Sequence, residues 1–167
     1  MKRFVIVFDN EPAESAPWIP GASASAKLAL VDNDAITDEL SRNKEARPLL
    51  AGNTGENPKL APFYKAALDK VAGDKPRVGL YSVSWLTYLG QADGCVLDFA
   101  ALEEQRTQGL ASGVDKKTAD DYVAKYSALM QDKARKVLKP ERILVLPVKE
   151  SPARKVELAA AFIQKLG

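Results

Sequence analysis

The sequence predicts an α/β protein in which helices pack on a central sheet of four or five strands, mixed or mostly parallel. Apolar runs of strand length occur at 3–8, 27–31, 77–85 and 142–148. Segments with helical periodicity separate most of these runs, which is typical of a layered α/β fold. A chain of 167 residues without internal repeats fits one domain. We therefore expect a single α/β domain over 1–167.

The N-terminal region is expected to contain two strands and a long loop. The first apolar run ends at Asp9, and the second ends at Asp32. Between them, residues 10–25 contain three prolines, which favours a loop of unusual length. Trp18 lies in this loop, and we expect it to anchor the loop to the core, with ligand stacking as the alternative.

The middle of the chain is expected to form a helix and then a strand. Asn57 is a suitable helix cap and the next residue is proline, so a helix is predicted over 57–72. The strand at 77–85 follows. Asp93 and Gly94 form a dipeptide typical of hairpins, so residues 95–99 either return antiparallel or open a helix.

The C-terminal region is expected to contain a long helix, a buried strand and a final helix. An apolar stripe recurs at helical spacing over 115–138, and Thr118 and Asp121 resemble a capping pattern. Residues 142–148 are almost continuously apolar, which is typical of a strand buried on both faces, inside the sheet rather than at its edge. Ser151 then caps the last helix.

The composition excludes several kinds of chemistry. The chain contains no histidine, which excludes Ser-His and Cys-His dyads, His-ligated zinc and imidazole acid–base catalysis. The formal net charge is +2, too small to indicate nucleic-acid binding. We interpret the basic residues of the C-terminal third as a solvated helix face, with an anion-binding surface as the alternative. They are Lys133, Arg135, Lys136, Lys139, Arg142, Lys149, Arg154 and Lys155.

Cys95 is the only cysteine, so an intramolecular disulfide is impossible. The stretch GQADGCV is similar to the nucleophile turn of isochorismatase-like hydrolases, but its glycine spacing departs from that pattern. We expect the thiol to be buried and unreactive. No uncharged apolar stretch approaches the roughly 18 residues of a membrane span, and the short apolar run at the N-terminus does not resemble a signal peptide. We expect a cytoplasmic protein without a membrane partner.

Carboxylates at strand ends form the most specific candidate site. Asp9 and Glu11 follow the first strand, and Asp32 and Asp34 follow the second. If the two strands are parallel neighbours, these four side chains meet at one edge of the sheet, where α/β proteins bind ligands. Carboxylate oxygens are the ligands that Mg²⁺ prefers. The alternative is that these acids only favour the turns after the strands.

The segment FVIVFDNEP resembles the first strand of response-regulator receiver domains. The resemblance implies that Asp9 and Asn10 hold the place of the acidic metal-binding pair, with Asp32 as phospho-acceptor, Ser82 as strand-end hydroxyl and Lys149 as strand-end lysine. The chain departs from the family in two ways. An amide replaces one carboxylate, and the interval before Asp32 is too short for the helix and strand that a receiver domain places there. The family is therefore not assigned.

Two classes of function remain, and the sequence does not decide whether the protein is an enzyme. The more concrete is Mg²⁺-assisted binding or transfer of a phosphoryl group, in which Asp9 and Asp32 act together with Ser82 and Lys149. A phosphorylated ligand would then be the partner, and no organic cofactor is indicated. The other is a non-catalytic interaction or regulatory module that uses the 10–25 loop or the basic C-terminal helices.

Overall fold

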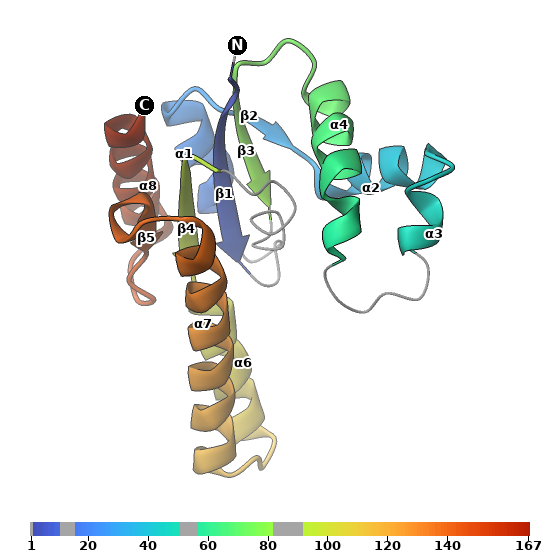
Figure 1. Cartoon of the computed structure of the whole chain (residues 1–167). Helices are drawn as coiled ribbons and strands as arrows, with labels where there is room; N and C mark the ends of the chain where they lie inside the picture. Colours follow the sequence, from blue (N-terminus) through green and yellow to red (C-terminus); the bar gives the residue numbers. More distant parts are fainter. Residues whose placement is uncertain (1, 11–15, 51–56, 82–91) are drawn as a thin grey trace.

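The computed structural model describes residues 2–10, 16–50, 57–81 and 92–167. The chain is an α/β protein with one five-stranded sheet, which confirms the predicted fold class. All strands are parallel, in the order β2-β3-β1-β4-β5 (Figure 1). The strands are β1 (Phe4–Asn10), β2 (Ala29–Val31), β3 (Arg77–Tyr81), β4 (Gly94–Asp98) and β5 (Ile143–Val145).

Helices cover both faces of the sheet. On one face, α1 (Trp18–Ser25) packs against α8 (Pro152–Leu166). The other face is covered by α2 (Asn33–Arg42), α4 (Ala61–Ala72) and parts of α6 (Ala100–Ala111) and α7 (Lys116–Val137). The shorter helical segments are α3 (Arg47–Leu50), η2 (Pro58–Leu60) and η3 (Pro140–Arg142). None of the described helices is both long enough and apolar enough to span a bilayer.

The central strand β1 divides its side chains between two hydrophobic cores. Val5 and Val7 belong to the core beneath α2, α4 and α7, whereas Ile6 and Phe8 belong to the core beneath α1 and α8. Alternation along a strand sends successive side chains to opposite faces. A strand that is buried on both faces therefore has a continuous apolar sequence, as residues 3–8 do.

The predicted loop at 10–25 is wrong for its second half, because residues 18–25 form α1. Pro20 lies in the first turn, where a backbone N–H has no intrahelical acceptor, so proline is tolerated. The helix is held by its contact with α8. At Gly21 an added Cβ would lie 3.0 Å from Val156 Cγ2, so glycine permits the close approach of the two helices.

The predicted hairpin at Asp93 is also wrong, because Gly94–Asp98 forms β4, parallel to β1. Asp93 instead ties the start of β4 to β1. Its backbone N–H donates to the carbonyl of Val5, and its carboxylate accepts from the Val5 N–H, both at 2.8 Å. Because Asp-Gly pairs favour any tight turn, the dipeptide marks the beginning of a strand as readily as a hairpin.

The predicted interior position of 142–148 is wrong, because β5 is a three-residue strand at the edge of the sheet. Ile143 packs in one hydrophobic core, and Leu144 and Leu146 pack in the other. Apolar side chains of this run therefore contact both cores, although Val145 is 42% exposed. A continuous apolar run thus indicates contacts on both faces of the sheet and does not distinguish an interior strand from an edge strand.

The helices α6 and α7 form an antiparallel pair that projects beyond the sheet (Figure 1). We call residues 100–137 the arm. The long helix predicted over 115–138 is confirmed, although its cap is Asp115, whose carboxylate accepts from the Thr118 N–H at 3.0 Å. Only the base of the arm lies against the sheet, where Met130 and Ala134 of α7 are buried.

Candidate functional site at the carboxyl ends of the strands

The strand order creates a switch point between β1 and β4. These strands are neighbours, yet α1 after β1 covers one face of the sheet and α6 after β4 lies with the helices of the other face. In open α/β sheets, a crevice forms outside the carboxyl ends of the strands at such a point, and ligands bind there. Each of the two strands carries an aspartate at or next to this end: Asp9 in β1 and Asp98 in β4.

Asp98 is the last residue of β4 and is 3% exposed. Its Oδ1 accepts from the backbone N–H of Ala100 at 3.0 Å, at the start of α6. Lys155 Nζ lies 2.9 Å from both carboxylate oxygens. The Trp18 indole N–H donates to Oδ2 at 2.7 Å. A buried carboxylate is tolerated when its lone pairs are satisfied in this way.

Lys155 and Trp18 bring two helices to the end of β4. Lys155 lies in the first turn of α8 and is 5% exposed, and Trp18 begins α1 and is 2% exposed. The Trp18 ring also packs edge-to-face on Phe8, with ring centroids 5.8 Å apart. The predicted anchoring of Trp18 to the core is thus confirmed. We call Trp18, Asp98 and Lys155 the Asp98 clasp, since it joins β4, α1 and α8.

One feature of the sequence could have indicated the Asp98 clasp, but it was not recognised. Asp98 ends the apolar run GCVLD in the same way that Asp9 ends FVIVFD, so both read as strand-end acids. The hairpin interpretation of residues 93–94 obscured this. Lys155 carried no signal, because it was one basic residue among many in the C-terminal third and its partner lies 57 positions away.

Asp9 is 3% exposed and lies opposite Leu97 of β4. Because strand side chains alternate, Asp9 lies on the face of Val7, whereas Asp98 lies on the face of Val96. The two carboxylates therefore flank the switch point from opposite sides of the sheet. This leaves Asp9 outside the clasp, at the end of the central strand.

Cys95 lies beneath Asp9, opposite Val7, and is fully buried. Burial raises its pKa well above the usual range for a thiol, and the negative charge of Asp9 adds to the effect. A thiol with a raised pKa is protonated at neutral pH and is a poor nucleophile. The expectation that Cys95 is structural agrees with this environment.

Asp32 and Asp34 lie at the same edge of the sheet as Asp9, two strands away. β2 is parallel to β1, but β3 lies between them, a separation of roughly 10 Å at the usual strand spacing. The Asp32 carboxylate caps α2 by accepting from the Asp34 N–H at 2.9 Å. It also adds to the effect of burial in raising the pKa of Tyr81.

The predicted magnesium site therefore stays a prediction. The two strands are parallel as required but are not neighbours. Within the described parts of the chain, no group of three or more acidic or cysteine side chains is placed to hold a metal ion. Glu11 and Ser82 lie outside the described residues. Lys149 is exposed in the turn after β5, with β4 between that strand and β1.

A small cavity of about 270 Å³ lies between α2 and α4, and no strand residue lines it. Its polar wall is the Glu39 carboxylate, which accepts from Lys70 at 2.5 Å and from Arg42 at 2.8 Å. The hydrogen bond from Lys70 is the main cause of the lowered pKa of Glu39. These charges satisfy one another, so we place the candidate site at the switch point rather than here.

Comparison with known proteins supports the fold alone. No family model matches the chain, and no curated protein matches it. The crystal structure of an uncharacterized protein from Eubacterium ventriosum ATCC 27560 has a TM-score of 0.51 at 10% identity, covering 99% of each chain. An unliganded sugar kinase from Janibacter sp. HTCC2649 has a TM-score of 0.44 at 14% identity, covering 98% of this chain and 95% of the kinase. The likeness to the kinase is too distant to bear on function.

Proposed function

We propose that the switch point between β1 and β4 binds a phosphorylated small molecule together with Mg²⁺, with Asp9 as the principal metal ligand. One observation carries the proposal: the Asp9 carboxylate is 3% exposed next to the carboxyl end of the central strand, at the point in the strand order where open α/β sheets bind ligands. Such a carboxylate is an oxygen ligand suited to Mg²⁺. The bound ion would neutralise charge on phosphate oxygens.

The remaining predicted residues have supporting roles in this proposal. Glu11 lies two positions after Asp9 in the chain and would complete the metal site. Ser82 and Lys149, the latter in the turn after β5, would contact phosphate oxygens. Asp32 and Asp34 lie beyond β3. A ligand longer than two strand spacings is needed to reach both Asp9 and Asp32, so we assign this pair to the far end of the ligand.

The metal part of the proposal is tested by thermal unfolding with and without MgCl₂, against KCl of equal ionic strength. Mg²⁺ that binds the native state should raise the Tm of the wild type, because binding stabilises only the folded form. Asp9→Asn should abolish this rise. Asp69→Asn, an exposed aspartate on α4, is the matched control and should keep it. An equal Mg²⁺ response in Asp9→Asn and the wild type would contradict the proposal.

The phosphate part is tested by calorimetric titration with inorganic phosphate, with and without Mg²⁺. We expect binding that requires Mg²⁺ and that weakens in Lys149→Met, since a lysine contributes a point charge to a phosphate site. Lys165→Met removes an exposed lysine from the other end of α8 and should leave binding unchanged. Phosphate binding without Mg²⁺, or equal loss in both variants, would show a nonspecific basic surface instead.

The second candidate function is an interaction module, and the arm favours it. The segment 18–25 is packed against α8 and is not a free loop. The arm, in contrast, projects from the sheet and carries Tyr122 and Leu129 with 41% and 47% exposure. Large exposed apolar side chains on a projecting helix are typical of a surface that another molecule covers.

A further inference from the structure

The helix α7 carries a stripe of exposed residues on the face turned away from the sheet. Its buried residues, Ala119, Met130 and Ala134, lie on the opposite face. Helical spacing places the exposed residues in one row, because positions three, four and seven apart share a face. We call this row the α7 stripe, and its members are Asp121, Lys125, Ala128, Leu129, Asp132 and Lys136.

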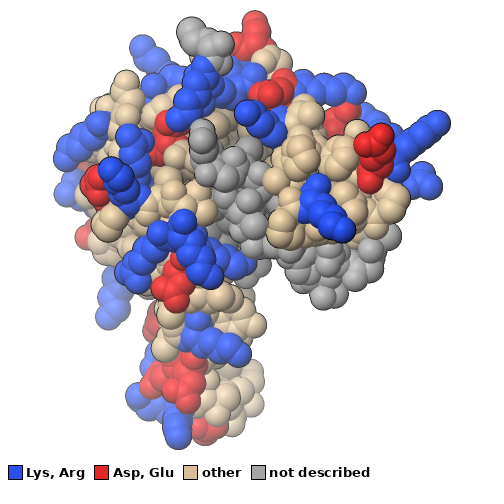
Figure 2. Space-filling model, viewed as in Figure 1, with Lys and Arg blue, Asp and Glu red and all other residues tan. Residues whose placement is uncertain are grey.

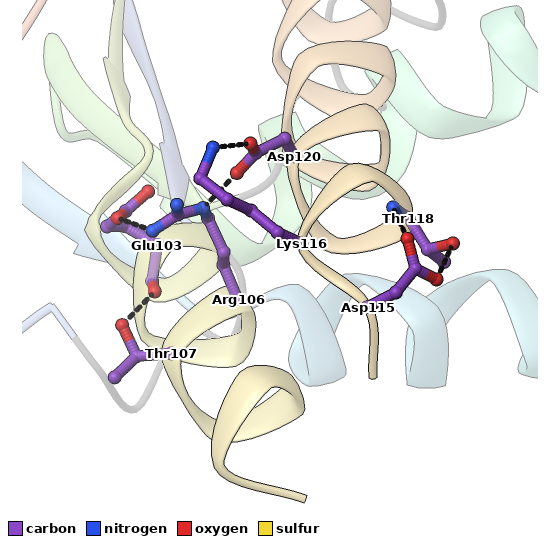
Figure 3. Close-up of polar contacts among 7 residues, drawn as sticks. All are labelled: Glu103, Arg106, Thr107, Asp115, Lys116, Thr118 and Asp120. Atoms are coloured by element: carbon purple, nitrogen blue, oxygen red, sulfur yellow. Dashed lines mark hydrogen bonds and ion pairs between the residues drawn. The ribbon is translucent and has the colours of Figure 1, made fainter. Parts of the chain in front are cut away.

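The charges of the stripe differ from the other charges of the arm. On the side of α7 that meets α6, Arg106 forms ion pairs with Asp120 at 2.6 Å and with Glu103 at 2.9 Å (Figure 3). Lys116 forms a further ion pair with Asp120 at 2.6 Å. The charges at this contact therefore neutralise one another within the arm. The charged side chains of the α7 stripe lack such close partners among the described residues.

Asp121, Lys125 and Lys136 make no side-chain hydrogen bond or ion pair with any described residue. Asp132 has only a 3.7 Å contact with Arg135, in which both side chains are more than 60% exposed. Such an exposed pair is weak and is readily exchanged for another partner.

The order of charges along the stripe is self-complementary. From the tip of the arm to its base the residues are acidic, basic, apolar, acidic and basic. Figure 2 shows that acidic and basic side chains are interspersed on the arm. Two copies of α7 that cross antiparallel, with Leu129 against Ala128 of the second copy, place Asp121 beside Lys136 and Lys125 beside Asp132. The two-fold axis repeats each pair, since an isologous contact is symmetric.

A parallel arrangement of the same two helices gives the opposite result. Each charged residue would then face its own equivalent, Lys125 against Lys125 and Asp132 against Asp132. Like charges at such positions repel. The pattern therefore selects the antiparallel register, in which the apolar centre at Leu129, 47% exposed in one copy, becomes buried.

We propose that two copies of this chain associate through the α7 stripe as an antiparallel, two-fold symmetric dimer. The interface is narrow, with an apolar centre and a charged rim, so it belongs to the class of small, weak interfaces. Its formation depends on protein concentration and decreases at high salt, which screens the exposed pairs. The proposal does not depend on a ligand at the switch point.

The decisive test is a charge exchange, measured by sedimentation equilibrium at low salt. Lys125→Glu and Asp132→Lys should each weaken dimerisation about tenfold, because each replaces two attractive contacts by two repulsive ones. The double variant Lys125→Glu with Asp132→Lys should restore the wild-type constant. Lys165→Glu on α8 makes the same charge change outside the stripe and should have a much smaller effect.

Several outcomes would overturn the proposal. A monomeric wild type at the highest soluble concentration would do so, as would a double variant that dimerises no better than the single variants. Leu129→Glu should also dissociate the dimer. An unchanged dimer dissociation constant in this variant would place the interface elsewhere. Because all substituted side chains are exposed, circular dichroism should show a folded protein in every case.

Discussion

Two of the ionic clusters among the described residues have similar distances and very different surroundings. In the Asp98 clasp, Lys155 lies 2.9 Å from the Asp98 carboxylate, and the two side chains are 6% and 1% exposed. In the arm, Arg106 lies 2.6 Å from Asp120, and the two side chains are 23% and 37% exposed. The shorter contact is the less important one for stability, because the water around it competes for the same charges.

The difference arises from what happens when a cluster loses a member. In the arm, water replaces the missing partner at little cost. In the clasp, a charge without its partner would stay buried, which is strongly unfavourable. The clasp also joins three elements that are distant in sequence, whereas the arm cluster joins two consecutive helices. Burial and position therefore decide the contribution of an ion pair, and its length does not.

The largest effect is expected for Lys155→Met. The variant leaves the Asp98 carboxylate buried without its cation, and loss of one partner of a buried pair typically costs about 3–5 kcal/mol. The free energy of unfolding from urea titration measures this. The double variant Asp98→Asn with Lys155→Met removes both charges and should recover part of the loss. A single-variant loss no larger than that of an exposed pair would show that water reaches the clasp.

A smaller loss is expected for Trp18→Phe. Phenylalanine keeps most of the ring that packs on Phe8 but lacks the indole N–H that donates to Asp98 at 2.7 Å. Asp98 Oδ2 keeps Lys155 as a donor, so the loss is that of one hydrogen bond to a charged group, about 1.5–3 kcal/mol. Combining this variant with Lys155→Met should give a loss that differs from the sum of the two, because both side chains contact one carboxylate. Strict additivity would mean that the clasp does not act as a unit.

A loss of about 1 kcal/mol is expected for Ser151→Ala, the usual effect of removing a helix cap. The Ser151 hydroxyl accepts from the Arg154 N–H at 3.3 Å and begins the turn of α8 that carries Lys155. Ser151→Asp keeps an acceptor at this position and should retain stability. If urea titration shows the same loss in free energy of unfolding for both variants, the side chain of residue 151 does not stabilise this turn as a cap.

The sequence was informative where a local pattern determined the structure. Runs such as FVIVF form strands wherever helices cover both faces, so β1 and β3 were predictable, and the apolar stripe of α7 predicted its length. The position of β5 at an edge was not predictable, because an edge strand with apolar contacts on both faces has the same composition as a central one. The helix α1 was missed because its stability comes from α8, which its own composition does not reveal.

The candidate site was predictable only in part. The aspartate at the end of the first apolar run places Asp9 at the carboxyl edge of the sheet, where the proposed site lies. The position of β3 between β1 and β2 was not encoded in any local pattern, so the predicted meeting of Asp9 with Asp32 had no basis in the residues themselves. The partner of Asp98 is determined only when α8 folds back onto the sheet, which is a property of the tertiary structure.

The smallest effect is expected for Arg106→Met in the arm. The free energy of unfolding at neutral pH should change less than in Ser151→Ala, because water replaces the lost contacts.

The same variant should change more clearly how the free energy of unfolding depends on pH in the acid range. Lys116 first, and then Arg106, holds the pKa of Asp120 below its usual range. A carboxyl group with a lowered folded-state pKa stabilises the fold above its unfolded-state pKa, and this contribution is lost as the pH falls through the folded-state value. Arg106→Met brings the two pKa values closer together, so unfolding should depend less steeply on pH in the acid range. Urea titrations at several acidic pH values, with Arg135→Met as the exposed control on the same helix, measure this slope. An equal change of slope in both variants would show that Asp120 senses only the general charge of the arm.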